Sequence, residues 1–316
     1  MHSINVALNR GISNITLGSR AAVARNKFSR MVPISCAASK VNGNSSNIAV
    51  VRDLQNPRDI DISLKKIGEL KNSLNSAGFT RFDISLDCQK ELNLLRCELD
   101  NLEVDKHDPA SNRQRAYSSG IILPWSGDFF PIPSSKTVAG EKSFYYQGNF
   151  NPEYANKPRE FNSISNELIN SNLLKNLVAT DYSLTEWSTH EHNMPLYVGI
   201  HLVKLSVDED HHESIASPNH LHQDGEKYTF AHLIDRINVI GGENFISNVQ
   251  NAGKLPSQLG KSELMAEFVI DKPLQSYGVC DPLVSHHVNG VKLGDKGPTG
   301  FRSVVLIDFC STSKNI

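Results

Sequence analysis

The segment His222-Gln223-Asp224-Gly225 places an imidazole and a carboxylate two residues apart. In a β-strand, side chains at positions i and i+2 point to the same face, so both could reach one metal ion. Taken alone, a His-x-Asp tripeptide is weak evidence, and a surface turn is the simpler interpretation. The surrounding sequence favours a metal site, because ten of the twelve histidines lie between His190 and His287.

A third metal ligand can come from the histidine doublet His286-His287, which lies in a predicted strand 64 or 65 residues after His222. Alternation along a strand places the two members of the doublet on opposite faces, so only one can be a ligand. Two histidines and one carboxylate on one face of an octahedral ion leave three open positions, as in non-haem Fe(II) oxygenases.

Arg302 opens the apolar run Phe301–Phe309, 16 residues beyond His286. A charged side chain in so apolar a strand is costly unless it is paired. A guanidinium holds a carboxylate through two parallel hydrogen bonds, so Arg302 could anchor the distal carboxylate of 2-oxoglutarate. The alternative is a structural ion pair with Asp308 or Asp295.

An ordered set of short stretches resembles the family of Fe(II)/2-oxoglutarate dioxygenases that includes the bacterial L-isoleucine 4-hydroxylases. The resemblance covers most of the chain from about Arg113 to the C-terminus. The matching stretches are Arg113-Gln114-Arg115-Ala116-Tyr117, Tyr146-Gln147-Gly148-Asn149-Phe150-Asn151, Pro158-Arg159-Glu160-Phe161, Val198-Gly199-Ile200-His201, His222-Gln223-Asp224-Gly225-Glu226, Gly241-Gly242-Glu243, Asp281 through Val284 with His286, and Gly300-Phe301-Arg302 with Leu306-Ile307-Asp308-Phe309.

This resemblance implies a double-stranded β-helix, also called a jelly-roll or cupin-like fold. It implies that His222, Asp224 and His286 are the iron ligands and that Arg302 anchors 2-oxoglutarate. His287 then occupies a position that is usually small in the family, and we expect it on the outer face of the strand. The implied cofactors are Fe(II), 2-oxoglutarate as co-substrate and O2, with ascorbate as the reductant.

The resemblance also implies hydroxylation of an aliphatic carbon of a free L-amino acid such as isoleucine or leucine, giving succinate and CO2. Such a substrate carries one ammonium and one carboxylate. Arg113, Arg115 and Arg159 are candidates for binding the carboxylate, and Glu243 for binding the amino group. Structural ion pairs, for example with Glu160, explain the arginines equally well.

Three alternatives stay open. The acceptor could be a carrier-bound residue or a natural-product intermediate. The metal site could serve a cupin-type dioxygenase or hydrolase that does not use 2-oxoglutarate. The chain could also be a non-catalytic cupin-like binding domain, which would not need an arginine at position 302.

The remaining histidines have simpler interpretations. His220 shares a predicted strand face with His222 and could be a third metal ligand or a group that hydrogen-bonds to a ligand. We expect hydrogen-bonded core or cavity-wall positions for two others in predicted strands, and loop positions for two pairs. The core pair is His201 and His232, and the loop pairs are His190 with His192 and His211 with His212.

Hydrophobic spacing predicts three helices upstream of a β-rich half. Leu64, Ile67, Leu70, Leu74 and Ala77 recur at helical spacing, with Ser63 as N-cap and Gly78 as C-cap. The other helices are expected at Leu92–Leu102 and Ser165–Val178, and residues 107–135 read as a loop. After Thr180, strands are predicted at Leu196–Leu205, Tyr228–Ile240, Leu264–Ile270, Leu283–Val288 and Phe301–Phe309. The predicted class is therefore mainly β, with flanking helices on one outer sheet face.

Composition limits the function further. The 316 residues carry a net charge of −2, which gives no basic face for nucleic acid. No apolar run approaches the roughly 20 residues that cross a bilayer. The five scattered cysteines favour a reducing compartment. We expect a soluble cytoplasmic enzyme for a small-molecule substrate, and the sequence leaves its oligomeric state open.

The first acidic residue is Asp53, and the preceding segment is rich in Ser and Arg. Residues 1–52 are therefore expected to be either a disordered leader or a transit peptide for organelle import. The catalytic domain is expected to span residues 53–316.

Overall fold

The computed structural model describes residues 49–51, 60–62, 67–85, 89–147, 157–216 and 218–312. They belong to one compact unit, Ser46–Ile316. The leader expected at residues 1–52 lies outside the described residues, except for a three-residue strand at its end. Among the described residues, no helix is long and apolar enough to span a bilayer.

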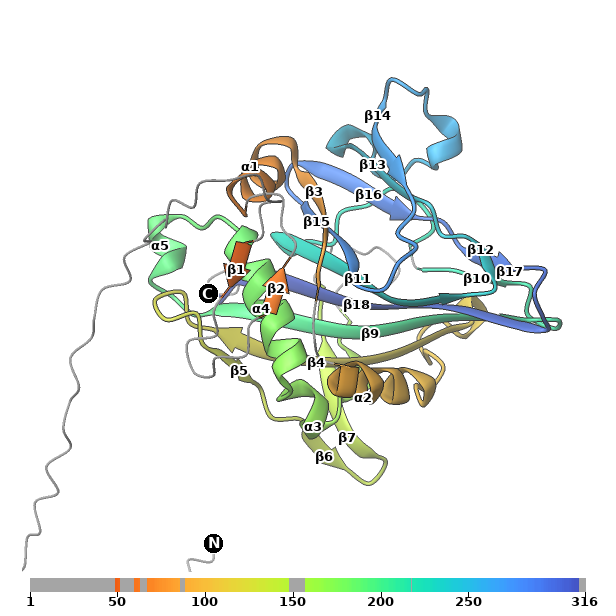
Figure 1. Ribbon diagram of the computed structural model, residues 1–316, viewed down its shortest axis with the longest axis horizontal. Coiled ribbons are helices and arrows are strands. Elements are labelled where there is room, and N and C mark those ends of the chain that lie inside the picture. Colours follow the sequence, from red (N-terminus) through yellow and green to blue (C-terminus); the bar gives the residue numbers. More distant parts are fainter. Residues whose placement is uncertain are drawn as a thin grey trace, which may run out of the picture. The chain divides into compact units, whose positions relative to one another are not determined.

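A large sheet forms the centre of the fold (Figure 1). Its strand order is β3 (Phe79–Asp83), β15 (Gln275–Cys280), β11 (Tyr228–Ile237), β18 (Thr299–Ser311), β9 (Leu196–Asp208), β4 (Arg113–Ile122), β8 (Arg159–Asn162), β7 (Gly140–Tyr145) and β6 (Ser135–Thr137), with β5 (Phe129–Pro131) paired to β4. The pairs are antiparallel except β4 with β8. The longest strands, β9 and β18, pair over their whole length and form the floor of the site.

Smaller sheets complete the β structure. One has the order β14 (Leu264–Phe268), β13 (Asn244–Asn248) and β16 (Val284–Val288), and another has β10 (Glu213–Ser214), β17 (Val291–Leu293) and β12 (Val239–Gly241). A short pair joins β1 (Ala49–Val51) to β2 (Ile60–Ile62). The sheet containing β16 carries one half of the candidate site.

Helices cover the outer face of the large sheet (Figure 1). They are α1 (Ile67–Ala77), α2 (Gln89–Asp100), α3 (Asn166–Ile169) and α4 (Asn172–Leu184). A further short helix, α5 (Thr189–His192), buries no residue, and short 3-10 turns lie at Pro109–Ser111, Val249–Asn251 and Pro256–Gln258. Leucines of α1, α2 and α4 pack against alternate residues of β9 and β18, such as Ile200 and Ile307. Each such side chain, fully buried, contributes roughly 1.5–3 kcal/mol. The predicted helical cover on one sheet face is confirmed.

The opposite face of the large sheet has a second apolar cluster. Val203 and Leu205 of β9 pack there with Val304 of β18 and with Ile246 and Val284 of the smaller sheet. The two clusters use alternate residues of the same strands, as a sheet packed on both faces requires. The space between the large and small sheets holds the candidate site.

The predicted helix Ser165–Val178 is two helices. Ser165 accepts a hydrogen bond from the backbone of Leu168 at 3.2 Å and caps α3. Ser171 accepts one from the backbone of Leu174 at 3.3 Å and caps α4. Each serine satisfies an N–H group that has no partner within its helix, so the chain restarts a helix after Asn170.

The prediction that residues 107–135 form a loop is wrong. This region contains β4, a central strand paired with β9 over ten residues. Its sequence, RQRAYSSGII, lacks an apolar alternation because its inner face presents Arg113, Arg115 and Tyr117 instead of aliphatic side chains. Because these polar side chains form a cavity wall, the strand has no alternating apolar pattern that the sequence analysis could recognise. The expected loop at His190 and His192 is also wrong, because both lie in α5.

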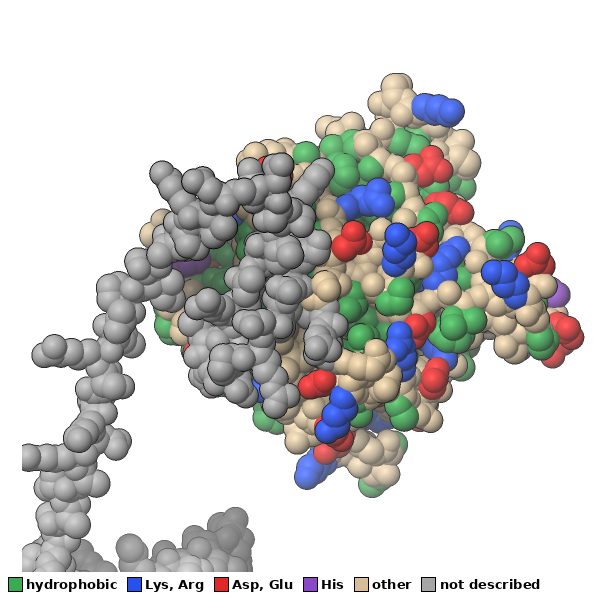
Figure 2. All heavy atoms as spheres, viewed as in Figure 1, with side chains coloured by type: hydrophobic (Ala, Val, Ile, Leu, Met, Phe, Trp, Pro, Cys, Tyr) green, Lys and Arg blue, Asp and Glu red, His purple; other side chains and the backbone are tan. Residues whose placement is uncertain are grey.

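Acidic and basic side chains are interspersed on the helix-covered face that Figure 2 shows, over the described residues. This agrees with a net charge near zero. Three free cysteines, Cys97, Cys280 and Cys310, are found among the described residues.

Candidate active site

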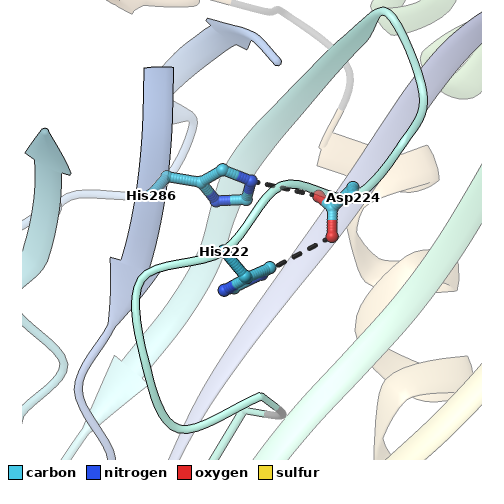
Figure 3. A group of neighbouring side chains, drawn as sticks. All are labelled: His222, Asp224 and His286. Atoms are coloured by element: carbon cyan, nitrogen blue, oxygen red, sulfur yellow. Dashed lines mark ion pairs between the residues drawn. The ribbon is translucent and has the colours of Figure 1, made fainter. Parts of the chain in front are cut away.

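His222, Asp224 and His286 meet between the large and small sheets (Figure 3). Their nearest nitrogen and oxygen atoms all lie within 4.8 Å of one another. Asp224 Oδ2 is 3.3 Å from His286 Nε2, and Asp224 Oδ1 is 3.5 Å from His222 Nε2. Adjacent ligands of an octahedral ion at about 2.1 Å lie about 3 Å apart, so this spacing fits a single divalent ion.

A backbone bridge holds the two histidines together. The N–H of His222 donates to the carbonyl of His286 at 3.0 Å, and the N–H of His286 donates back at 2.9 Å. His222 Nδ1 donates to the carbonyl of His220 at 2.8 Å, which leaves Nε2 as an acceptor facing Asp224. The strand expected around His222 is therefore wrong: His222 lies in a loop and makes a single bridge to β16.

Asp281 orients the Asp224 turn. Its two carboxylate oxygens accept the backbone N–H groups of Asp224 at 2.9 Å and of Gly225 at 2.8 Å. Gly225 has a φ of 90°, which a side chain at that position would disfavour. The Gln223 side chain donates to the Asp281 carbonyl at 2.6 Å. Asp281, which belongs to one of the stretches that resemble the family, thus positions Asp224 by binding its backbone.

The charges of the cluster are coupled. Burial alone would raise the pKa of Asp224, but His286 and His222 hold it well below its usual value. Burial alone would lower the pKa of His286, but the negative charges of Asp224 and Asp281, 3.3 and 3.6 Å from its Nε2, raise it to about 10. His286 Nε2 is buried and makes no hydrogen bond of acceptable geometry with the described residues. A nitrogen and carboxylate donor set with such an orphaned atom fits a divalent metal.

His287 points away from this cluster. Its ring stacks on Phe245 with centroids 6.3 Å apart, and its Nε2 lies 3.1 Å from Asn289 Oδ1. Burial lowers the pKa of His287 to about 4, so it is neutral near pH 7. Alternation along β16 therefore leaves only His286 of the doublet facing Asp224.

A cavity of about 120 Å³ opens beside the cluster. Along β18, alternate residues from Arg302 to Asp308 line it, with Val304 and Leu306 between. Its remaining walls include Ala231 and further residues of β9, β11, β15 and β16. One strand thus carries a cation and an acid at the two ends of an apolar stretch.

Arg302 is 4% exposed and forms no ion pair with the described residues. Its Nε has no hydrogen-bond partner there. The suggested pairing with Asp308 is wrong, because Asp308 binds His201 instead. Burial lowers the pKa of Arg302 to about 10 and raises that of neighbouring Tyr277 to about 12. A buried cation without an acid suits an anionic ligand.

The three arginines proposed for the substrate have different surroundings. Arg113 lines the cavity, but its guanidinium forms a buried ion pair with Asp105 at 2.6 Å. Arg115 and Arg159 both lie against the ring of Tyr145, with guanidinium carbons 5.3 and 5.0 Å from its centroid. Arg115 and Arg159 both line the cavity, where Arg115 donates to His201 and Arg159 donates to Gln147 at 2.5 Å.

Glu243 does not line the cavity; its carboxylate accepts a hydrogen bond from Asn289 at 3.1 Å. Two acids that the sequence analysis did not select for substrate binding, Glu226 and Asp308, line it instead. The signals were present: Glu226 ends the His-x-Asp-Gly-Glu segment, and Asp308 interrupts an apolar strand.

A directed chain of hydrogen bonds crosses the cavity wall. Arg115 Nη2 donates to His201 Nδ1 at 2.6 Å, since a guanidinium cannot accept. His201 Nε2 therefore carries the proton and donates to Asp308 Oδ2 at 2.8 Å. Burial and the positive charge of Arg115 lower the pKa of His201 to about 4. His201 is a neutral bridge, which agrees with its expected role as a hydrogen-bonded wall residue.

Comparison with known proteins identifies a family. The family model described as 2OG-Fe dioxygenase matches residues 97–308. An L-isoleucine-4-hydroxylase from Bacillus thuringiensis is 29% identical over 251 residues, which cover 77% of this chain and 95% of that protein. A 3(1)-hydroxy-L-isoleucine 4-dioxygenase from Pantoea ananatis is 25% identical over 257 residues, which cover 77% and 89%.

Solved structures agree on the fold. The crystal structure of IDO from Bacillus thuringiensis superimposes with a TM-score of 0.60 at 23% identity, covering 78% of this chain and all of that one. The structure of a bsmA homologue from Methylobium petroleophilum has a TM-score of 0.63 at 18% identity, covering 80% and 96%. The expected jelly-roll fold is confirmed.

Proposed function

The chain belongs to the 2OG-Fe dioxygenase family, and on this basis we propose that it hydroxylates an aliphatic carbon of a free L-amino acid similar to isoleucine or leucine. Membership makes the protein an oxidoreductase that uses Fe(II), 2-oxoglutarate and O2 on a small molecule. When bound, the iron and co-substrate supply the oxidation of an unactivated C–H bond, with release of succinate and CO2. Ascorbate is proposed as the reductant that keeps the iron ferrous.

The observation that carries the proposal is the convergence of His222, Asp224 and His286 (Figure 3). These residues would hold Fe(II) on one face and leave the other face for ligands. The backbone bridge between the histidines and the hydrogen bonds from Asp281 keep the donor atoms together before metal binds. Hydrogen bonds that orient metal ligands in this way raise the affinity for the metal.

Arg302 is proposed to bind the distal carboxylate of 2-oxoglutarate. Its guanidinium is buried in the cavity without an acidic partner among the described residues. The Tyr277 hydroxyl, which burial keeps protonated, can donate a second hydrogen bond nearby. An anionic co-substrate would remove the penalty of an unpaired buried cation.

Two findings support an aliphatic amino acid as the substrate. The curated relatives are named for L-isoleucine and a hydroxylated L-isoleucine. In this chain, the cavity joins aliphatic side chains such as Val304 and Leu306 to the guanidinium groups of Arg115 and Arg159, which suit a carboxylate. We further propose that residues 53–316 form the catalytic unit of a soluble cytoplasmic enzyme, with residues 1–52 as a leader or organelle transit peptide.

A turnover panel tests this function. The full chain is supplied with Fe(II), ascorbate, 2-oxoglutarate and each L-amino acid in turn, and succinate and substrate mass are measured. We expect succinate with one added oxygen atom for an aliphatic amino acid, and neither product from the Asp224→Ala variant. Succinate without a modified amino acid would move the acceptor to a carrier-bound or natural-product substrate. No succinate from folded, iron-loaded protein would refute the enzyme and favour a binding domain.

A further inference from the structure

We propose that Glu226 and Asp308 together bind the α-ammonium of the substrate, so that a free amino group is required for recognition. The inference rests on the proposed function and names the residues that select the substrate. It replaces Glu243 with two acids that face the cavity and lie on different segments of the chain.

Each acid has one oxygen occupied and one left over. Glu226 Oε1 accepts a hydrogen bond from the Tyr145 hydroxyl at 3.0 Å, and Asp308 Oδ2 accepts one from His201 at 2.8 Å. Glu226 Oε2 and Asp308 Oδ1 are buried and have no hydrogen-bond partner among the described residues. Glu226 is 8% exposed and Asp308 4% exposed. Buried acceptors without donors are rare in folded proteins, and here they line the same cavity.

An ammonium group matches this pair. It has three N–H donors and a positive charge, so one ammonium can satisfy both free oxygens and retain a donor. Two buried carboxylates in one cavity repel each other, and a cation placed between them removes that repulsion. A neutral hydroxyl or keto group at the same carbon would supply at most one donor and no charge.

Several contacts position Asp308. It pairs with Gly199 across β18 and β9, and a Cβ at position 199 would overlap both of its carboxylate oxygens. The carboxylate therefore lies directly over the glycine. The hydrogen-bond chain from Arg115 through His201 leaves Asp308 only accepting, so Oδ1 is presented as an anionic acceptor.

A positive pole adjoins these acids. The hydroxyl of Tyr145 binds Glu226, while the ring of Tyr145 contacts the guanidinium groups of Arg115 and Arg159. Tyr145 thus contacts both an acidic and a basic part of the cavity wall. In an α-amino acid the ammonium and carboxylate are attached to the same carbon, so adjacent subsites of opposite charge are complementary to it. N-acylated amino acids, 2-hydroxy acids and carrier-bound thioesters each lack one of the two charges.

The test compares the isosteric variants Glu226→Gln and Asp308→Asn with wild type and with Glu267→Gln, an exposed glutamate on β14. Isoleucine binding is measured by calorimetry on the Fe(II) and 2-oxoglutarate loaded full chain without O2. Binding of 2-oxoglutarate is followed by its metal-to-ligand absorption band. We expect each cavity variant to weaken isoleucine binding about tenfold or more while the 2-oxoglutarate affinity stays within twofold. N-acetylisoleucine and 2-hydroxy-3-methylpentanoate should not compete with isoleucine in wild type.

Unchanged isoleucine affinity in both cavity variants would overturn the inference, as would a loss seen only in Glu243→Gln. Glu226 lies two residues from Asp224, so Glu226→Gln could disturb iron binding. Asp308 is not adjacent to a proposed ligand in the sequence, so Asp308→Asn tests the inference without that effect. The proposed function fails differently, through wild-type protein that gives no succinate. If that protein still binds isoleucine, the comparison of variants remains decisive; if it binds no amino acid, the inference is also overturned.

Discussion

Replacing Asp281 should weaken iron binding although Asp281 is not a proposed ligand. Its two oxygens accept the backbone N–H groups of Asp224 and Gly225, and the side chain is almost completely buried. In Asp281→Asn one oxygen can still accept, but the amide NH2 faces the second N–H, so one hydrogen bond is lost and two donors oppose each other.

The magnitude follows from that single hydrogen bond. A hydrogen bond to a charged group contributes about 1.5–3 kcal/mol, and loss of a group that orients a ligand weakens metal binding about 10- to 100-fold. These values agree, since tenfold in affinity equals about 1.4 kcal/mol. Asp281→Ala loses both hydrogen bonds and should be weaker still.

The assay is an anaerobic Fe(II) titration of the metal-free full chain at saturating 2-oxoglutarate, followed by the metal-to-ligand absorption band. Asp295→Asn, a substitution of an exposed aspartate, serves as the matched control. We expect the Fe(II) dissociation constant to rise in the order Asp295→Asn, Asp281→Asn, Asp281→Ala. An unchanged dissociation constant in folded Asp281→Ala protein would refute the reasoning that this carboxylate orients Asp224.

Further predictions concern the cavity and the sheet. Arg302→Lys retains the charge but not the two-pronged geometry, so the dissociation constant of 2-oxoglutarate should rise about tenfold in a titration of the absorption band, and an unchanged value would exclude Arg302 as the anchor. Gly199→Ala should displace Asp308 and weaken amino acid binding in calorimetry without changing 2-oxoglutarate binding; equal amino acid affinity would contradict the contact. Folding lowers the pKa of His201 from 6.5 to about 4, so its contribution to stability is complete above pH 6.5 and is lost as the pH falls toward 4. The free energy of unfolding in urea should therefore fall by up to about 3 kcal/mol over this pH range in wild type, and by less in His201→Gln. The same pH dependence in both proteins would argue against this assignment. His232 and Asp181 form a fully buried pair at 2.9 Å, so His232→Ala should lower the free energy of unfolding by about 3 kcal/mol or more; a loss below 1 kcal/mol would show that the pair matters little.

The three proposed metal ligands could be predicted from the sequence because the spacing of side chains along a strand selects most of them. Spacing by two residues linked His222 to Asp224, and alternation separated His286 from His287. The strand expected at His222 was wrong, since the loop is held by Asp281, 57 residues away from Asp224. No local pattern reveals a carboxylate that arrives from so far along the chain.

The acids of the cavity were harder to find. Asp308 was considered only as a partner for Arg302, although six residues along one strand separate their Cα atoms by about 20 Å. Glu243 was suggested by the preceding glycines, but Gly241 and Gly242 adopt φ of 84° and 73° and turn the chain so that Glu243 meets Asn289. Charge placement inside a cavity depends on such turns, which composition does not encode.

The alternation of β18 constrains how this chain can change in length. Arg302, Val304, Leu306 and Asp308 face the cavity, while Val305, Ile307 and Phe309 pack under the helices. Inserting or deleting one residue within this stretch would exchange the two faces beyond that point, moving Ile307 into the cavity and Asp308 into the apolar core. Indels should therefore be absent from this strand in functional relatives, while the mostly exposed residues 255–262 between β13 and β14 can vary in length. Substrate range should diversify through side-chain volume at positions 304 and 306.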